Sequence, residues 1–244
     1  MYIPLLATVA GFIDAIAGGG GLITVPAWTM ALGPGAAAIA TNKVGALGAA
    51  GMALVVYARR HRLPWREGLP FLVAIVLGAF CGSQLTSLIP SRAFAWILLL
   101  LCPVVLWMVW SRERLFSDRP TTPAPRAQFF LAGYLVGVYD GFFGPGGGTF
   151  MLLALLMMTH LPLMEALALS KLANTVSAVG GLAGFAWHGH VHWGWGAIGA
   201  VCMMAGAYFG ARFTSARAVG AVRPALTIVV ALLMGKILLD LLRP

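Results

Sequence analysis

Charged residues are scarce in this chain of 244 amino acids, and their scarcity excludes an ordinary soluble fold. Only 9% of the residues are Asp, Glu, Lys or Arg, whereas soluble proteins carry roughly 25%. A membrane-spanning helix needs about 20 mostly apolar residues, and several stretches without any charge are long enough. The sequence therefore predicts an all-α polytopic membrane protein. The charge-free stretches are 15–42, 68–91, 93–111, 141–164 and 172–211.

Cysteine is also rare, and the three cysteines form no metal-binding pattern. Cys81, Cys102 and Cys202 lie in apolar runs without a CxxC or Cys/His arrangement, which favours small buried side chains over a zinc site or a disulfide framework. The motifs of serine hydrolases, zinc proteases and phosphate-binding loops are missing as well. We therefore expect no enzyme activity, no cofactor and no metal. The net charge of +9 resides in short loops, as the positive-inside rule describes, rather than in a nucleic-acid-binding patch.

Glycine, in contrast, is abundant, and its arrangement reveals an internal repeat. Three segments of the first part of the chain match three segments of the second part in the same order. The sequence therefore predicts two homologous halves, 1–110 and 128–244, joined by a polar cytoplasmic linker at 111–127. The matching pairs are 11–21 with 137–148, 41–46 with 173–178, and 78–87 with 206–215.

Each half consists of four predicted helical elements, and glycines interrupt the first of them. Contiguous glycines at Gly18–Gly21 and Gly146–Gly148 disfavour a continuous helix, because each glycine costs about 1 kcal/mol relative to alanine. Unwound backbone survives at membrane depth only where protein or a water-filled cavity satisfies it. We therefore expect the two interruptions to meet inside the bundle around a small electropositive chamber. The elements are 2–32 and 128–158, 37–58 and 166–187, 69–89 and 195–213, and 93–110 and 224–241.

The distribution of loop arginines bears on the topology. If all eight elements span the membrane, nine loop arginines lie inside and four outside; if the interrupted elements are re-entrant hairpins, eleven lie inside and two outside. The positive-inside rule favours the second arrangement, in which the two halves are inverted repeats, as in many transporters. Both arrangements stay open.

Ionisable residues inside membrane segments mark candidate functional sites. In one interpretation, Lys43 and Lys171 attract an anion together with glycine backbone amides and the N-termini of half-helices that begin near Leu22 and Thr149. In the other interpretation, each lysine neutralises an aspartate, Asp14 or Asp140, in a structural ion pair. A carboxylate would serve an anion site only if it took up a proton when transport is coupled to an ion gradient. The candidate substrate-binding residues are Gly18, Gly19, Gly20, Gly21, Thr24, Asn42, Lys43, Gly146, Gly147, Gly148, Thr149, Lys171 and Asn174, with Thr41, Thr175 and Glu165 as further polar residues in the same segments.

Two other patterns have simpler explanations. The GxxxG spacings at Gly78–Gly82, Gly180–Gly184 and Gly206–Gly210 predict helices that approach one another closely. The alternating histidines at 188–192 lie beside Trp193 at the end of an apolar run, where an interfacial aromatic belt is expected. We therefore interpret them as interfacial residues and not as metal ligands.

The glycine segments and the polar residues that follow them resemble the TauE/SafE sulfite exporter family, also called the sulfonate uptake permease family. The resemblance rests on Gly18–Pro26, Ala40–Lys43 and Tyr139–Gly148 and extends over nearly the whole chain. It implies a multi-pass transporter of the bacterial inner membrane that carries sulfite, sulfonates or related sulfur-containing organic anions by alternating access. It also implies that the glycine segments form the transport pathway.

Two alternatives to a secondary transporter remain open. An anion channel of the same fold would conduct without coupling to an ion gradient. A non-transporting membrane scaffold would have no solvent-accessible cavity beside Gly18–Gly21. The expected partners are a small anionic substrate and membrane lipid, with no nucleic acid, and a homodimer is one candidate assembly.

Overall fold

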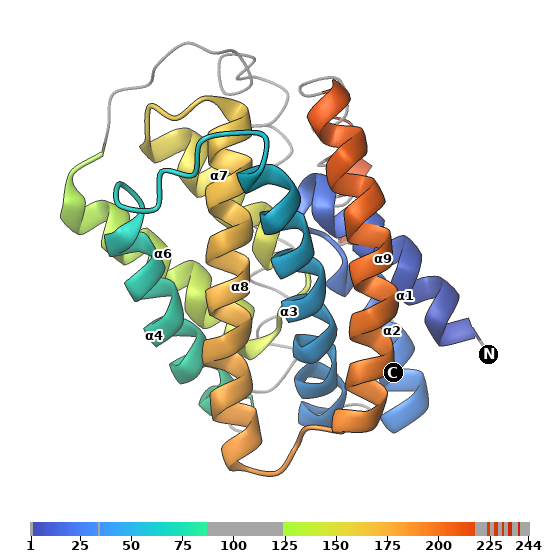
Figure 1. Ribbon diagram of the computed structural model, residues 1–244. Coiled ribbons are helices and arrows are strands. Elements are labelled where there is room, and N and C mark those ends of the chain that lie inside the picture. Colours follow the sequence, from blue (N-terminus) through green and yellow to red (C-terminus); the bar gives the residue numbers. More distant parts are fainter. Residues whose placement is uncertain are drawn as a thin grey trace.

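The computed structural model describes residues 2–33, 35–86 and 124–217, together with a few positions between 224 and 239. The elements predicted at 93–110 and most of 224–241, and most of the linker 111–127, lie outside the described residues. Within the described part every regular element is a helix (Figure 1). The helices are α1 (Tyr2–Ala17), α2 (Gly21–Leu32), α3 (Ala36–Ala58), α4 (Leu69–Leu85), α6 (Arg126–Phe142), α7 (Gly147–Met158), α8 (Leu163–Trp187) and α9 (Trp193–Arg217).

Helix length separates two classes of element. In the described part of the chain, α3, α8 and residues Trp193–Ala216 of α9 are long and apolar enough to cross a membrane. The 12 residues of α2 and of α7 extend only about 18 Å at 1.5 Å per residue, far less than a hydrocarbon core of about 30 Å. These lengths and compositions agree with the prediction of a helical membrane protein. α2 and α7 are each too short to cross the hydrocarbon core alone, and we refer to them as half-helices.

Both predicted helix interruptions are present, but the second lies earlier than predicted, because Gly147 and Gly148 already belong to α7. Residues 18–20 separate α1 from α2, and residues 143–146 separate α6 from α7. Gly18, Gly144 and Gly146 adopt φ angles of +82°, +91° and +80°, a left-handed conformation that costs other residues roughly 1–2 kcal/mol. The glycines therefore let the chain turn where any other residue would resist it.

The two halves of the chain pack crosswise. The first helix of each half lies along a helix of the other half, because α1 packs against α9 and α6 packs against α4. Between these pairs lie α3 and α8, which contact one another at the centre of the bundle (Figure 1). The half-helices α2 and α7 pack against α3 and α8, respectively, so both interruptions are brought next to the central helices.

The ends of the elements show how the α6–α7 unit is placed. The backbone N–H of Ala124, just before α6, donates a hydrogen bond of 2.9 Å to the carbonyl of Met158 at the end of α7. The unit therefore begins and ends at the same end of the bundle. The loop between α3 and α4 also lies at this end, whereas the loop between α8 and α9 lies at the opposite end (Figure 1).

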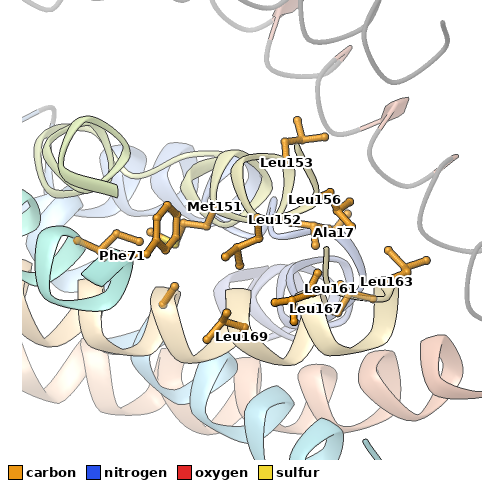
Figure 2. Packing of buried hydrophobic residues seen from close by; sticks show 14 of the residues in the cluster. Ala17, Phe71, Met151, Leu152, Leu153, Leu156, Leu161, Leu163, Leu167 and Leu169 are labelled. Carbon is orange, nitrogen blue, oxygen red and sulfur yellow. The ribbon is translucent and has the colours of Figure 1, made fainter. Parts of the chain in front are cut away.

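An apolar cluster surrounds the half-helix α7. Met151 and Leu152 are fully buried, and Figure 2 shows Met151 beside the ring of Phe71 from α4. The Phe71 ring in turn stacks on Phe129 of α6 with centroids 4.9 Å apart. Protein side chains thus replace lipid around this short helix, which fixes the position of its N-terminal glycines.

The GxxxG glycines lie where helices meet, which confirms their predicted packing role. A Cβ atom on Gly82 of α4 would lie 2.1 Å from the carbonyl oxygen of Val138 in α6. A Cβ atom on Gly206 of α9 would lie 1.9 Å from the carbonyl oxygen of Thr8 in α1. The glycines therefore permit backbone contact between helices of different halves.

Candidate functional site

The two helix interruptions touch one another. A Cβ atom on Gly18 would lie 2.3 Å from the carbonyl carbon of Gly148 and 2.5 Å from the nitrogen of Thr149. The hydroxyl of Thr149 donates a hydrogen bond of 2.7 Å to the carbonyl of Ala17. The two unwound segments therefore cross at backbone contact distance, and we call this place the crossing.

A tight ion pair joins the two halves on one side of the crossing. The Nζ atom of Lys43, in α3, lies 2.6 Å from Oδ2 of Asp140, in α6, and both side chains are less than 5% exposed. Lys43 also donates to the main-chain carbonyl of Asp140. The hydroxyl of Ser177, in α8, donates to the same carboxylate oxygen at 2.6 Å. The Oδ2 atom of Asp140 therefore accepts hydrogen bonds from both an ammonium and a hydroxyl group.

The second ion pair is looser. The Nζ atom of Lys171, in α8, lies 3.6 Å from Oδ2 of Asp14, in α1, and donates instead to the main-chain carbonyl of Asp14. The other carboxylate oxygen, Oδ1, accepts the N–H of Gly20 at 3.2 Å. Oδ2 is buried and has no hydrogen-bond partner among the described residues. The contact of this oxygen with Lys171 is therefore longer than that of Asp140 with Lys43.

Each lysine thus neutralises the aspartate of the other half. The formal charges of these four groups cancel, so they do not form the electropositive chamber that we expected. The contacts match the ion-pair interpretation of Lys43 and Lys171, and a buried charge of this kind is costly to leave unpaired. Any affinity of the crossing for an anion must therefore come from neutral donors or from a rearrangement of an ion pair.

Two asparagine side chains next to the crossing supply neutral donors. Thr24 donates a hydrogen bond of 2.5 Å to Oδ1 of Asn42, and a Cβ atom on Gly21 would lie 3.6 Å from Nδ2 of Asn42. A Cβ atom on Gly148 would lie 3.2 Å from Nδ2 of Asn174. Both asparagines are at most 5% exposed, and neither amide nitrogen donates a hydrogen bond within the part of the chain that the structure describes.

The half-helices add a favourable potential for an anion. α2 and α7 both begin at the crossing, and a helix N-terminus acts as roughly half a positive charge. Most backbone N–H groups of the two first turns already donate to carbonyls of the interruptions, among them those of Leu22, Ile23 and Thr149, so the potential comes from the helix dipoles and not from free N–H groups. Together with the two asparagine amides, these dipoles can bind a small oxyanion without a net positive charge.

The structure brings the predicted site residues together. Most are buried at the crossing, Gly21 is half-buried there, and three further polar residues are engaged elsewhere. Thr41 accepts the N–H of His192, Thr175 donates to the carbonyl of Lys171 in its own helix, and Glu165 lies 3.6 Å from Arg62 at the end of the bundle. The buried residues are Asp14, Gly18, Gly19, Gly20, Thr24, Asn42, Lys43, Asp140, Gly146, Gly147, Gly148, Thr149, Lys171 and Asn174.

Sequence reasoning missed three hydroxyl groups that stabilise the crossing. Ser177 binds Asp140, the hydroxyl of Tyr139 donates to the carbonyl of Pro145, and that of Tyr57 donates to the carbonyl of Ala15 at 2.8 Å. The sequence could have indicated Ser177, because it follows Asn174 by three residues and therefore lies on the same face of α8. No sequence pattern marks Tyr57 or Tyr139 in this way.

The histidines that follow α8 lie close to one another. The rings of His188 and His190 stack with centroids 5.9 Å apart. The described residues contain no group of three His, Cys, Asp or Glu side chains that could hold a metal ion.

Comparison with known proteins gives a consistent result over the whole chain. Residues 3–237 match the family model described as sulfite exporter TauE/SafE. The chain is 33% identical to the probable membrane transporter protein ORF9 of Sinorhizobium sp, over 100% of this chain and 94% of that protein. It is 34% identical to the probable membrane transporter protein YfcA of Escherichia coli strain K12, over 96% of this chain and 88% of that protein. No solved structure matches the chain.

Proposed function

The chain belongs to the sulfite exporter TauE/SafE family, and from this premise we propose that it is a secondary transporter of sulfite, sulfonates or related small sulfur-containing anions. The crossing of the two helix interruptions carries this proposal. It places two half-helix N-termini and the buried amides of Asn42 and Asn174 at one point, which suits an oxyanion.

We propose that Asp14 couples transport to a proton. Its Oδ2 atom has no hydrogen bond among the described residues, whereas Oδ2 of Asp140 accepts two hydrogen bonds of 2.6 Å. A proton on Asp14 would remove the charge that Lys171 balances. The ammonium group of Lys171 could then pair with the substrate anion, so that one proton and one anion bind together without a change of net charge.

The topology that fits this function is a pair of inverted repeats with re-entrant α1–α2 and α6–α7 hairpins. The hydrogen bond between Ala124 and Met158 supports a hairpin for α6–α7. The four arginines of the α3–α4 loop lie at its open end, which is cytoplasmic by the positive-inside rule. The two hairpins would enter the bacterial inner membrane from opposite sides and rock against each other at the crossing, giving alternating access.

Flux measurements test the transporter against its alternatives. Proteoliposomes that contain the purified protein should accumulate sulfite or methanesulfonate when a pH gradient is imposed. This accumulation should stop when the gradient is collapsed. A channel would instead give flux that persists without the gradient, and a scaffold would give none. Either result would contradict the proposal.

Replacement of Asn174 with alanine should lower the anion flux at least tenfold, because a buried donor to the substrate is lost. Loss of one hydrogen bond to a charged group costs about 1.5–3 kcal/mol, which corresponds to this factor. Thr175→Ala is the matched control, since among the described residues the hydroxyl of Thr175 bonds only the carbonyl of Lys171 in its own helix. Equal flux in the two variants would remove Asn174 from the substrate site.

Replacement of Asp14 with asparagine should separate transport from its driving force. Without a group that binds a proton, the variant should exchange substrate across the vesicle membrane but should no longer accumulate it when a pH gradient is applied. Counterflow of labelled substrate measures exchange, and uptake under the gradient measures coupling. Undiminished accumulation in the variant would show that Asp14 does not carry the proton.

A further inference from the structure

A cavity lies at the end of the bundle where α4, α6 and α8 begin, away from the crossing. Its volume is about 520 Å³, within the range of roughly 300–1,000 Å³ typical of small-molecule sites. Its walls are the loop between α3 and α4 with the start of α4, the start of α6, the loop between α7 and α8, and Leu169 of α8. The half-helix α7, about 18 Å long, separates this cavity from the crossing, because its last residue lines the cavity and its first residues lie at the crossing.

The cavity carries an excess of positive charge. Arg66 and Arg126 both line it, and neither guanidinium has an ion-pair partner among the described residues. The one lining carboxylate, Glu67, is held by Arg62 at 2.5 Å. His160 lines the same wall, with Nε2 3.9 Å from that carboxylate. Arg62 also lies 3.6 Å from Glu165, so this cluster keeps one negative charge, and Arg66 and Arg126 together exceed it by one positive charge. The guanidinium of Arg66 lies over the ring of Trp65, 5.2 Å from its centroid.

The helices around the cavity reinforce this potential. α4 and α6 begin with residues that line the cavity, and α8 begins two residues after Leu161, which also lines it. Their N-terminal ends bring partial positive charge to the same place. The arginines and the helix ends therefore favour an anion.

The inner wall of the cavity is apolar. Phe129, Leu161 and Leu169 line it and are less than 10% exposed. An inorganic oxyanion would leave this wall without a contact, whereas an anion with an attached hydrocarbon group would cover it. Burial of apolar surface contributes about 25 cal/mol per Å², so such a group would add to the affinity.

We propose that this cavity is a second anion-binding site, specific for an oxyanion that carries an apolar substituent. Arg66 and Arg126 bind the oxyanion, and the wall of Phe129, Leu161 and Leu169 binds the substituent. An organic sulfonate from solution and the phosphodiester headgroup of an anionic lipid share this chemistry. The site is independent of the transport activity proposed above, because none of its lining residues belongs to the crossing.

Binding measurements on the purified wild-type protein in detergent test the site. Calorimetric titration with 1-hexanesulfonate, with dihexanoyl phosphatidylglycerol and with inorganic sulfate should give saturable binding of at least one of the first two ligands and at least tenfold weaker binding of sulfate. If the sulfonate binds and the lipid does not displace it, the site takes a soluble ligand. If the lipid binds and the sulfonate does not displace it, the site takes a lipid. If each ligand displaces the other, the site accepts both.

Variants locate the binding. Arg66→Gln and Arg126→Gln should each weaken it at least tenfold, whereas Arg60→Gln should not, because Arg60 is exposed in the same loop and does not line the cavity. Asn174→Ala should leave the binding unchanged, which distinguishes this site from the crossing. Absence of saturable binding, or equal affinity in the Arg66, Arg126 and Arg60 variants, would overturn the proposal.

Discussion

Alanine at position 43 should abolish anion flux and should destabilise the protein more than alanine at position 171. Lys43 forms the tight ion pair, 2.6 Å from Asp140, so its removal leaves a buried carboxylate without its counterion. Such a loss costs about 3–5 kcal/mol. Lys171 lies 3.6 Å from Asp14, whose Oδ2 atom already lacks a hydrogen bond among the described residues, so less stability is lost there. Thermal melting in detergent and flux in proteoliposomes measure the two effects.

The double variant Lys43→Ala/Asp140→Asn distinguishes stability from transport. It removes both charges of the pair, so its melting temperature should recover most of the loss seen in Lys43→Ala, while flux stays absent. Lys171→Ala should also lose flux, because the proposed coupling step requires its ammonium group. Wild-type flux in both single variants would show that neither lysine acts in transport.

Alanine at position 18 should prevent the two interruptions from meeting and should eliminate transport. The added Cβ atom would lie 2.3 Å from the carbonyl carbon of Gly148, and backbone atoms cannot yield as a flexible side chain can. The positive φ of Gly18 adds a conformational penalty of roughly 1–2 kcal/mol. We expect loss of flux together with a melting temperature several degrees lower.

Gly33→Ala is the matched control for this variant. Gly33 has a similar φ of +84°, but a Cβ atom there would have no neighbour within 4 Å. It therefore carries a backbone penalty without the steric conflict, and it should retain flux. If both alanine variants transported equally, close contact between the interruptions would not be required for function.

The positions of the helices and of their interruptions could be predicted from the sequence, because local chemistry determines both. Runs without charge locate the helices, and α3 begins one residue from its predicted start. Contiguous glycines locate the breaks to within a few residues, because the second break precedes Gly147 and Gly148, which are helical. α8 begins at Leu163 and not at 166, because Pro162 precedes the helix as its N-cap and Glu165 suits its first turn.

The partners of the buried charges could not be predicted from the sequence, because they depend on how the two halves pack. Lys43 and Asp140 are 97 residues apart, and the internal repeat does not place the two lysines at equivalent positions. Composition therefore suggested a positive chamber, whereas the packing produces two neutral pairs. Asn42 and Asn174 were predicted as donors from residue type and position, but only the three-dimensional structure shows that neither amide nitrogen donates a hydrogen bond within the described residues.

The crosswise ion pairs also constrain biosynthesis. As the ribosome delivers the first half to the membrane, Asp14 and Lys43 are inserted before Lys171 and Asp140, their respective counterions, have been translated. The nascent protein therefore holds Lys43 without its counterion until position 140 has been synthesised and Asp14 without its counterion until position 171. Contact with water, lipid headgroups or the insertion machinery must accommodate these charges in the meantime. Folding of the first half consequently finishes only after insertion of the second.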